Sequence, residues 1–406
     1  MAKLRVGNPA MIRYFNPGHE SAVLNASKYY RPPANQVLMQ NELAYLPAWY
    51  AQADDSVFVE NPLPNDFLTD IQAFPTLAKA VVSSELTTLS SQTVDLWGIS
   101  PQSVYFFEKL KQTHSLDWQI PEWKEIYRKL GSREAAQPVL SELIRIIPEI
   151  ESDILPRRFS DIDTLEKELI QNHGQQIVKS PYSSSGRGLV WLPSEKIARS
   201  ERQIISGMLN KQGSVSVEKA LDKRLDFSMH FEISAGGKTE FIGYSVFQTN
   251  PKGVYERSLL ASQEVLEKMI INRIDFSLLQ QVKTELIQQI EKNYAPHYVG
   301  CIGVDMLVYF SENKYKLNPC VEINMRKSMG YLAIRLTEQF LHLETHGSFF
   351  VNYHSASAET FQIHQTLKKH YPLIVKNNRI VSGYFNLCPV SEDTHYQAYL
   401  MLNLLH

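Results

Sequence analysis

The chain has 406 residues, with 41 lysines and arginines against 43 aspartates and glutamates, which gives a formal net charge of −2. At about 150 residues per domain, this length allows two or three domains. The near-neutral charge argues against a protein that coats nucleic acid, and a hydrophobic content of 44% excludes global disorder.

The first 115 residues predict a small α/β domain, because short strand-like runs alternate with helical runs. The strands are expected at residues 11–15, 56–59 and 80–82, and the helices at residues 42–52 and 101–111.

From residue 132 onward the pattern changes to longer helices and longer strands. Helices are predicted at residues 133–146, 163–172, 195–210, 263–269, 276–293 and 328–342. Strands are predicted at residues 176–179, 189–192, 214–220, 227–233, 240–247, 302–310 and 315–323. The last part of the chain predicts strands at 349–353, 379–387 and 396–402 around a helix at 358–370.

The chain gives no sign of a membrane or secretory segment. No stretch comes near 18 consecutive apolar residues, and the N-terminus lacks the apolar run of a signal peptide. Cys301, Cys320 and Cys388 are scattered and form no CxxC pair, so neither a disulfide framework nor a zinc site is expected. These features favour a cytoplasmic protein.

A lysine at the end of one predicted strand is followed by a loop of small residues. Lys179 is followed by Ser-Pro-Tyr-Ser-Ser-Ser-Gly-Arg-Gly. Glycine lets backbone N–H groups approach phosphate oxygens, and a lysine adds a point charge. The pattern therefore predicts a phosphate-binding loop, although it is not the Walker type, whose GxxxxGK[ST] is absent. A hairpin turn with a surface lysine is the other interpretation.

Three oxygen-bearing side chains lie in two strands near residue 310. Glu322 and Asn324 are two positions apart, so they project from one face of a strand, and Asp305 joins them if the two strands pair. Two carboxylates and an amide suit Mg²⁺ held together with phosphates. A solvated face of an antiparallel sheet is the alternative.

A third, weaker signal lies between these two. The segment Glu218-Lys219-Ala220 ends a predicted strand, where backbone groups can contact a flat base, and the carboxylate of Asp226 can hold ribose hydroxyls. By itself this segment is better explained as an exposed strand end.

Taken together, the order and spacing of these signals resemble the ATP-grasp superfamily over about residues 115–342. That family has a basic residue at a helix start, a second one ahead of a Gly-rich loop, a glutamate hinge, an acidic ribose contact, a "G-V-D" strand and an E-x-N-x-R motif. The matching residues are Arg133, Lys179, Ser183, Ser184, Ser185, Gly186, Arg187, Gly188, Glu218, Lys219, Ala220, Asp226, Asp305, Glu322, Asn324 and Arg326. Two of them depart from the usual pattern, since Arg133 stands where Lys is usual and Asp226 is shorter than the usual Glu.

The resemblance implies an α+β ATP-grasp fold, in which two subdomains clamp ATP, preceded by an α/β pre-ATP-grasp domain. The implied boundaries are residues 1–115 for the first domain and 116–346 for the ATP-grasp domain, with a nucleotide-clamping lid at about 196–255. Residues 347–406 remain as a C-terminal α+β extension.

The activity that the resemblance implies is ligation, in which ATP activates a carboxylate as an acylphosphate and an amine, or a thiol, attacks it. Asp305, Glu322 and Asn324 would bind Mg²⁺, for which Mn²⁺ can substitute, and Lys179 and Arg326 would assist catalysis. The partners would be small-molecule or peptide-like carboxylates and amines, without nucleic acid or membrane, and homodimers are common in the family. An ATP-grasp kinase that phosphorylates a hydroxyl, and a non-catalytic ATP-binding regulatory protein, remain alternatives.

Four further residues are candidates for substrate contact. His19 and Glu20 follow the first predicted strand, where ligands usually bind in α/β domains. Lys252 and Arg257 lie in a predicted loop that follows a strand of the lid. A capped turn and a solvated loop, respectively, explain the same residues without a ligand.

Overall fold

The computed structural model describes residues 10–89, 91–171, 174–183, 188–192, 196–251 and 253–404. The chain forms two compact units. Unit 1 consists of Met1–Trp123, Leu259–Ser262 and Leu332–His406, and unit 2 of Lys124–Ser258 and Gln263–Tyr331. The boundaries expected for three domains stay a prediction.

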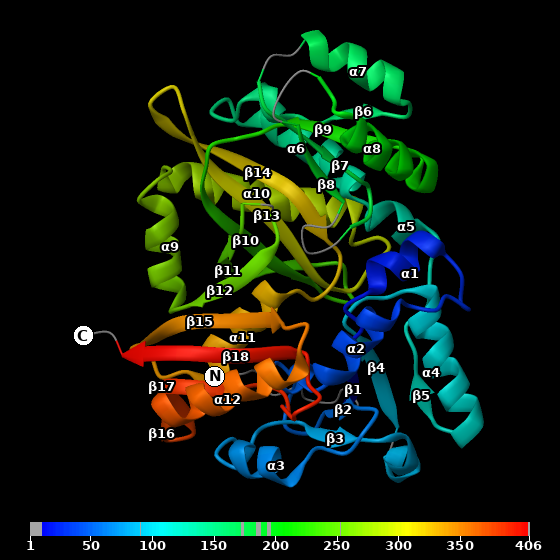
Figure 1. Ribbon diagram of the computed structural model, residues 1–406, viewed down its shortest axis with the longest axis vertical. Helices are drawn as coiled ribbons and strands as arrows, with labels where there is room; N and C mark the ends of the chain where they lie inside the picture. The colour runs from blue at the N-terminus through cyan, green and yellow to red at the C-terminus, as the bar shows by residue number, and fades with distance from the viewer. Residues whose placement is uncertain are drawn as a thin grey trace. The chain divides into compact units, whose positions relative to one another are not determined.

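A parallel sheet organises the N-terminal part of unit 1, in the strand order β3–β2–β1–β4–β5, shown in blue to cyan in Figure 1. Its strands are β1 (Met11–Tyr14), β2 (Ser56–Phe58), β3 (Lys79–Val81), β4 (Gln92–Leu96) and β5 (Trp118–Gln119). The accompanying helices are α1 (His19–Asn25), α2 (Ala34–Glu42), η1 (Leu46–Trp49), α3 (Asn65–Ile71), η2 (Ser83–Thr88) and α4 (Pro101–His114). This architecture confirms the predicted α/β domain.

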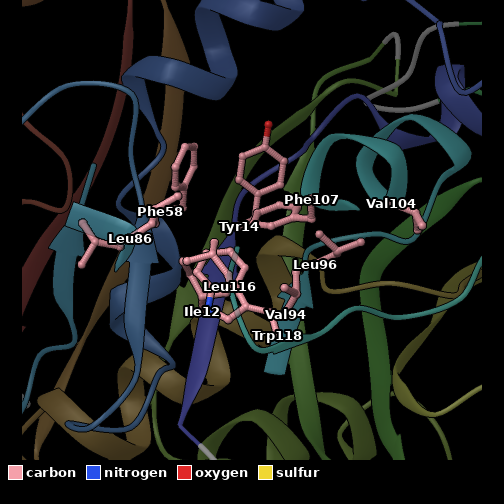
Figure 2. Packing of buried hydrophobic residues seen from close by; sticks show 11 residues of the cluster. Ile12, Tyr14, Phe58, Leu86, Val94, Leu96, Val104, Phe107, Leu116 and Trp118 are labelled. Carbon is pink, nitrogen blue, oxygen red and sulfur yellow. The ribbon is translucent and has the colours of Figure 1, made fainter. Parts of the chain in front are cut away.

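The core of this part is aromatic. Tyr14 on β1 packs edge-on against Phe107 of α4, with ring centroids 5.1 Å apart, and Phe58 of β2 lies 6.0 Å from Tyr14. Figure 2 shows these rings together with Ile12 and Trp118, which are also buried. Burying apolar surface on both strands and helix fixes the sheet against α4.

One N-terminal expectation differs from the structure, and several elements of this part were not expected. The helix expected at residues 42–52 is wrong, because α2 ends at Glu42 and a short 3₁₀ turn, η1, follows it. Pro47 lies within η1, where it cannot supply an N–H to an α-helix. The strand β4 was not expected, since its sequence QTVDL alternates polar and apolar residues over only five positions.

The C-terminal part of unit 1 is antiparallel, with neighbouring strands in the order β15–β18–β17–β16. The elements of this part are α11 (Met329–Phe340, which begins in unit 2), β15 (Thr345–Tyr353), α12 (Ser357–His370), β16 (Ile374–Lys376), β17 (Arg379–Asn386) and β18 (Tyr396–Leu404).

Unit 2 contains a small four-stranded sheet in the order β6–β9–β7–β8, whose neighbours are all antiparallel. The segments that build it are β6 (Arg157–Phe159), α7 (Ile162–Gln171), β7 (Gln176–Lys179), β8 (Leu189–Leu192), α8 (Arg199–Gln212) and β9 (Val215–Lys219). Leu165 of α7, Ile205 of α8 and Val178 of β7 are fully buried in one cluster, so both helices cover an apolar face of this sheet.

A second, larger group of strands in unit 2 has the order β14–β13–β10–β11–β12 and is also antiparallel. Its strands are β10 (Lys223–Ile233), β11 (Thr239–Thr249), β12 (Tyr255–Leu260), β13 (Gly300–Ser311) and β14 (Lys314–Asn324). The other helices of unit 2 are α5 (Ile126–Leu130), η3 (Arg133–Ala135), α6 (Ala136–Ile146), η4 (Ser152–Ile154), α9 (Gln263–Ile271) and α10 (Phe276–Asn293).

Strand β12 was not expected, so Arg257 lies on a strand rather than in the predicted loop. The three cysteines are buried free thiols. Among the described residues, no helix is long and apolar enough to cross a membrane.

Candidate functional site

The two predicted carboxylates face each other on the hairpin β13–β14. Asp305 and Glu322 are register partners, and Asn324 pairs with Gly303 two residues further along. The side-chain amide of Asn324 donates to Asp305 Oδ2 at 3.0 Å. The expected pairing of the two strands is thus confirmed, and it brings all three side chains to one face.

Asp305 lies next to other carboxylates. Burial, with the nearby carboxylate of Glu322, raises the pKa of Asp305 to about 7. Asp226 on β10 acts in the same direction, whereas Arg326 opposes it. Two carboxylates held this closely favour either a proton or a metal cation between them.

The donor set fits a hard cation. Carboxylate oxygens of Asp305 and Glu322 and the amide oxygen of Asn324 are ligands that Mg²⁺ accepts, with remaining positions left to water and phosphate. In the part of the chain that the structure describes, no group of three or more His, Cys, Asp or Glu side chains could hold a metal ion. The candidate site has two carboxylates, so substrate phosphates would have to supply further ligands.

Arg133 lies at the start of η3, just before α6. The hydroxyl of Ser132 accepts a hydrogen bond from Glu134 N at 3.3 Å and so starts this turn. The guanidinium of Arg133 donates to Ser180 O at 2.6 Å and to Ser183 Oγ at 3.1 Å. Its other nitrogen lies 3.1 Å and 3.2 Å from the two carboxylate oxygens of Glu322.

The ends of the predicted phosphate loop close on each other. Ser180 N donates to Gly188 O at 3.0 Å. Gly188 has φ +73°, and a Cβ there would lie 2.2 Å from Ser180 Oγ, so glycine is required for this closure. Ser184, Ser185, Gly186 and Arg187 lie outside the described residues.

Lys179 at the end of β7 forms a buried ion pair with Glu218 of β9, at 2.5 Å. Their side chains are 10% and 11% exposed. A pocket also brings Glu218 together with Arg133, and Cys320 and Val321 of β14 line it too. Two predicted nucleotide contacts thus meet in one pocket.

The rest of the predicted hinge has other partners. Lys219 Nζ pairs with Asp153 at 2.7 Å, and Ala220 N donates to Gln175 O at 2.9 Å. Asp226 accepts from Lys223 Nζ at 2.6 Å and from Thr249 Oγ1 at 3.0 Å. Sequence reasoning missed Lys223 and Thr249. Lys223 lies on β10 three residues before Asp226, whereas Thr249 comes close only because β11 pairs with β10.

The remaining predicted residues are more scattered. Arg326 follows β14 and donates to Lys327 O at 3.0 Å, and Arg257 donates to Gln248 Oε1 at 2.8 Å. Lys252 lies outside the described residues.

His19 and Glu20 begin α1 in unit 1, with His19 Nδ1 3.2 Å from Glu20 Oε2. Asn16 joins the loops after β1 and β4, since it donates to Gly98 O at 2.7 Å and accepts from Gly98 N at 3.2 Å. In the strand order of this sheet, β1 and β4 flank the position where the order reverses, and ligands commonly bind there.

Sequence comparison identifies no relative, because neither a family model nor a curated protein matches the chain. Solved structures do match. The N5-carboxyaminoimidazole synthetase from Staphylococcus aureus, complexed with ADP, has a TM-score of 0.51 and 13% identity, and the match covers 100% of this chain and 95% of that one. A biotin carboxylase–β-γ-ATP complex from Campylobacter jejuni has a TM-score of 0.50 and 11% identity, over 98% and 88% of the two chains.

These matches run over the whole chain, and they show that the chain has the ATP-grasp fold. The fold class inferred from the motifs is confirmed.

Proposed function

We propose that this protein is an ATP-dependent, Mg²⁺-dependent ligase that joins a carboxylate to an amine. The observation that supports it best is the facing pair Asp305 and Glu322, with Arg133 bridging Glu322 to the start of the phosphate loop. The fold matches two proteins that were crystallised with adenine nucleotides, which is in line with ATP as the cosubstrate.

Each residue then has a defined role in the proposed reaction. Lys179, Arg133 and the loop Ser183–Gly188 bind the phosphates, and Glu218, Lys219, Ala220 and Asp226 surround adenine and ribose. Asp305, Glu322 and Asn324 hold Mg²⁺, which neutralises the charge that develops on the transferred phosphoryl group.

Phosphoryl transfer needs positioning and electrostatic stabilisation more than a covalent nucleophile on the protein. Lys179 and Arg326 supply positive charge, and the carboxylate substrate attacks the γ-phosphorus to release ADP. The amine then displaces phosphate from the acylphosphate. We place the acceptor contacts at His19 and Glu20, with Lys252 and Arg257 as further candidates.

The test is acyl trapping. The protein is incubated with ATP, Mg²⁺, hydroxylamine and a panel of amino acids and small carboxylic acids, while ADP, phosphate and hydroxamate are measured. A ligase produces hydroxamate and ADP in equal amounts with one or more of the acids. Asp305→Ala and Glu322→Ala should each abolish both products.

Two outcomes would reject the ligase. ADP formed only together with a phosphorylated alcohol would indicate a kinase. ATP binding without turnover on any carboxylate, alcohol or amine would indicate a regulatory nucleotide-binding protein. Both alternatives retain the nucleotide site, so the assay separates them by product rather than by affinity.

A further inference from the structure

One side chain, Arg133, bridges two parts of the site that handle different ligands. Its Nη1 holds Ser180 O and Ser183 Oγ at the start of the phosphate loop, at 2.6 Å and 3.1 Å. Its Nη2 lies within 3.2 Å of both oxygens of Glu322. The Arg133 side chain is 10% exposed, so the ion pair is largely withdrawn from water.

The loop end of this bridge is fixed. Arg133 N donates to Pro181 O at 2.8 Å, which ties the main chain of η3 to the loop. Tyr182 is held by Gln212 of α8, whose side chain accepts from Tyr182 N at 2.8 Å and donates to Tyr182 O at 3.1 Å. The contact that can exchange is therefore the one between Arg133 and Glu322.

A cation bound at Glu322 competes with this contact, because both carboxylate oxygens already accept from Nη2. Separating a largely buried guanidinium from its carboxylate is costly unless another anion takes its place. Phosphates bound at the loop would lie next to Ser183 and would supply that anion.

We infer that Arg133 couples divalent-cation binding to nucleotide binding, because it occupies Glu322 until a nucleotide phosphate draws the guanidinium away. Arg133 is thus a positioning residue for a candidate metal ligand, beyond its contact with phosphate. The inference rests on the proposed nucleotide and metal site.

The chemistry of arginine explains why this position departs from the usual lysine. A guanidinium presents two nitrogens in a rigid fork, so one can hold the loop while the other holds Glu322. A lysine has a single nitrogen at this place and cannot span both groups in the same way.

The test measures Mn²⁺ binding to the full-length protein without nucleotide, by electron paramagnetic resonance of the free ion. In wild type this binding should be weak, and saturating ATP should strengthen it. In Arg133→Gln the nucleotide-free affinity for Mn²⁺ should rise about tenfold, within the range typical of coupled sites. ATP affinity should fall in the same variant.

Two controls separate this coupling from a general loss of positive charge. Lys179→Gln removes a cation of the same site whose partner is Glu218, so it should leave nucleotide-free Mn²⁺ affinity near the wild-type value. Arg145→Gln removes an exposed arginine paired with Glu142 on α6 and should change neither affinity. Adding Glu322→Gln to Arg133→Gln should cancel the tenfold gain.

Arg133→Lys keeps the charge and provides a second variant in case Arg133→Gln does not fold. Its gain in Mn²⁺ affinity should be smaller than that expected for Arg133→Gln. An unchanged or weaker Mn²⁺ affinity in folded Arg133 variants would overturn the coupling, as would an equal gain in Lys179→Gln. If wild type binds no Mn²⁺–ATP at all, the proposed function fails as well. If wild type binds Mn²⁺–ATP but the Arg133 variants gain nothing, only the coupling fails.

Discussion

At the scale of single residues, the site keeps its charges in pairs drawn from different functional parts. Lys179 is paired with Glu218, and Arg133 with Glu322. In both pairs a cation proposed to bind phosphate is held by an anion proposed to bind something else. In the proposed function, binding of the nucleotide and its metal would therefore replace these two ion pairs with contacts to the ligand.

Asp305 differs from these residues, because another carboxylate faces it. We predict that Asp305→Asn stabilises the metal-free protein at pH 8 by about 2 kcal/mol, after reducing the full pKa effect for partial exposure. The folded-state pKa is about 7 against an ordinary value of 3.8. Folding therefore favours the protonated form of Asp305. The contribution of this form to the unfolding free energy is complete below pH 4 and is lost as the pH rises towards 7.

Chemical denaturation in EDTA at pH 4.5 and pH 8 checks this prediction. The difference between variant and wild type should be about four times larger at pH 8 than at pH 4.5. Asp222→Asn, at an exposed carboxylate paired with Arg224, serves as the control and should change stability little at either pH. A destabilised Asp305→Asn at pH 8 would contradict the prediction.

The pair Lys179–Glu218 predicts strong non-additivity. Because both side chains are about nine-tenths buried, removing one partner leaves a buried charge, and each of Lys179→Met and Glu218→Gln should cost about 3 kcal/mol of unfolding free energy. The double variant should cost less than the sum of the single variants. A double-mutant cycle by urea denaturation measures this coupling, and additive effects would contradict it.

At the scale of elements, the sequence predicted best those segments whose apolar residues follow a clear pattern. The helix Phe276–Asn293 was predicted with its observed ends, because Asp275 caps it and its apolar residues recur at helical spacing. The strands that became β13 and β14 were also predicted, with bounds one or two residues inside the observed ends. The strands β4 and β12 were not predicted, because polar or charged residues separate their apolar ones, whereas the shorter strands β7 and β8 were predicted with their observed bounds.

For the site, chain order was enough to place Asp305 and Glu322 on neighbouring strands, but not to find the partner of Arg133. That contact joins residues 189 positions apart and depends on how η3 packs against β14. Likewise, the contact of Asp226 with Thr249 depends on the register between β10 and β11. Local sequence predicts helices and strands, whereas contacts between residues far apart in the chain depend on tertiary packing.

The closure of the phosphate loop gives a prediction at this scale. Gly188→Ala should weaken ATP binding at least tenfold, because its Cβ would clash with Ser180 Oγ at 2.2 Å and open the loop. Gly213→Ala, at the end of α8, is a matched control, since its φ is +82° but nothing lies within 4 Å of its Cβ position. Both substitutions pay the backbone cost of a positive φ, about 1 kcal/mol.

Isothermal titration with ATP and Mg²⁺, alongside thermal denaturation, distinguishes the two variants. Both should lose similar stability from backbone strain, with some additional loss from the clash in Gly188→Ala. Gly213→Ala should retain wild-type ATP affinity. Equal ATP affinities in the two variants would mean that loop closure does not matter for binding.

At the scale of the whole molecule, the net charge of −2 conceals local polarity. The basic residues Arg133 and Lys179 and the acidic residues Asp305 and Glu322 lie in one unit and nearly cancel in the sum. A ligand that carries both signs, such as a nucleotide with its metal, matches this arrangement better than either ion alone.

Binding of ATP and Mg²⁺ to this charge arrangement can be measured as a rise in the unfolding free energy. A ligand that binds only the folded chain at one hundred times its Kd should raise the unfolding free energy by about 2.7 kcal/mol. We expect ATP with Mg²⁺ to approach this value in thermal denaturation, whereas ATP with EDTA, or Mg²⁺ alone, should give a much smaller rise. Asp305→Ala should remove most of the gain that depends on Mg²⁺ but retain the smaller response to ATP with EDTA. If ATP stabilises the protein equally with Mg²⁺ and with EDTA, the carboxylates of β13 and β14 do not bind the metal, and the charge arrangement of this unit has another purpose.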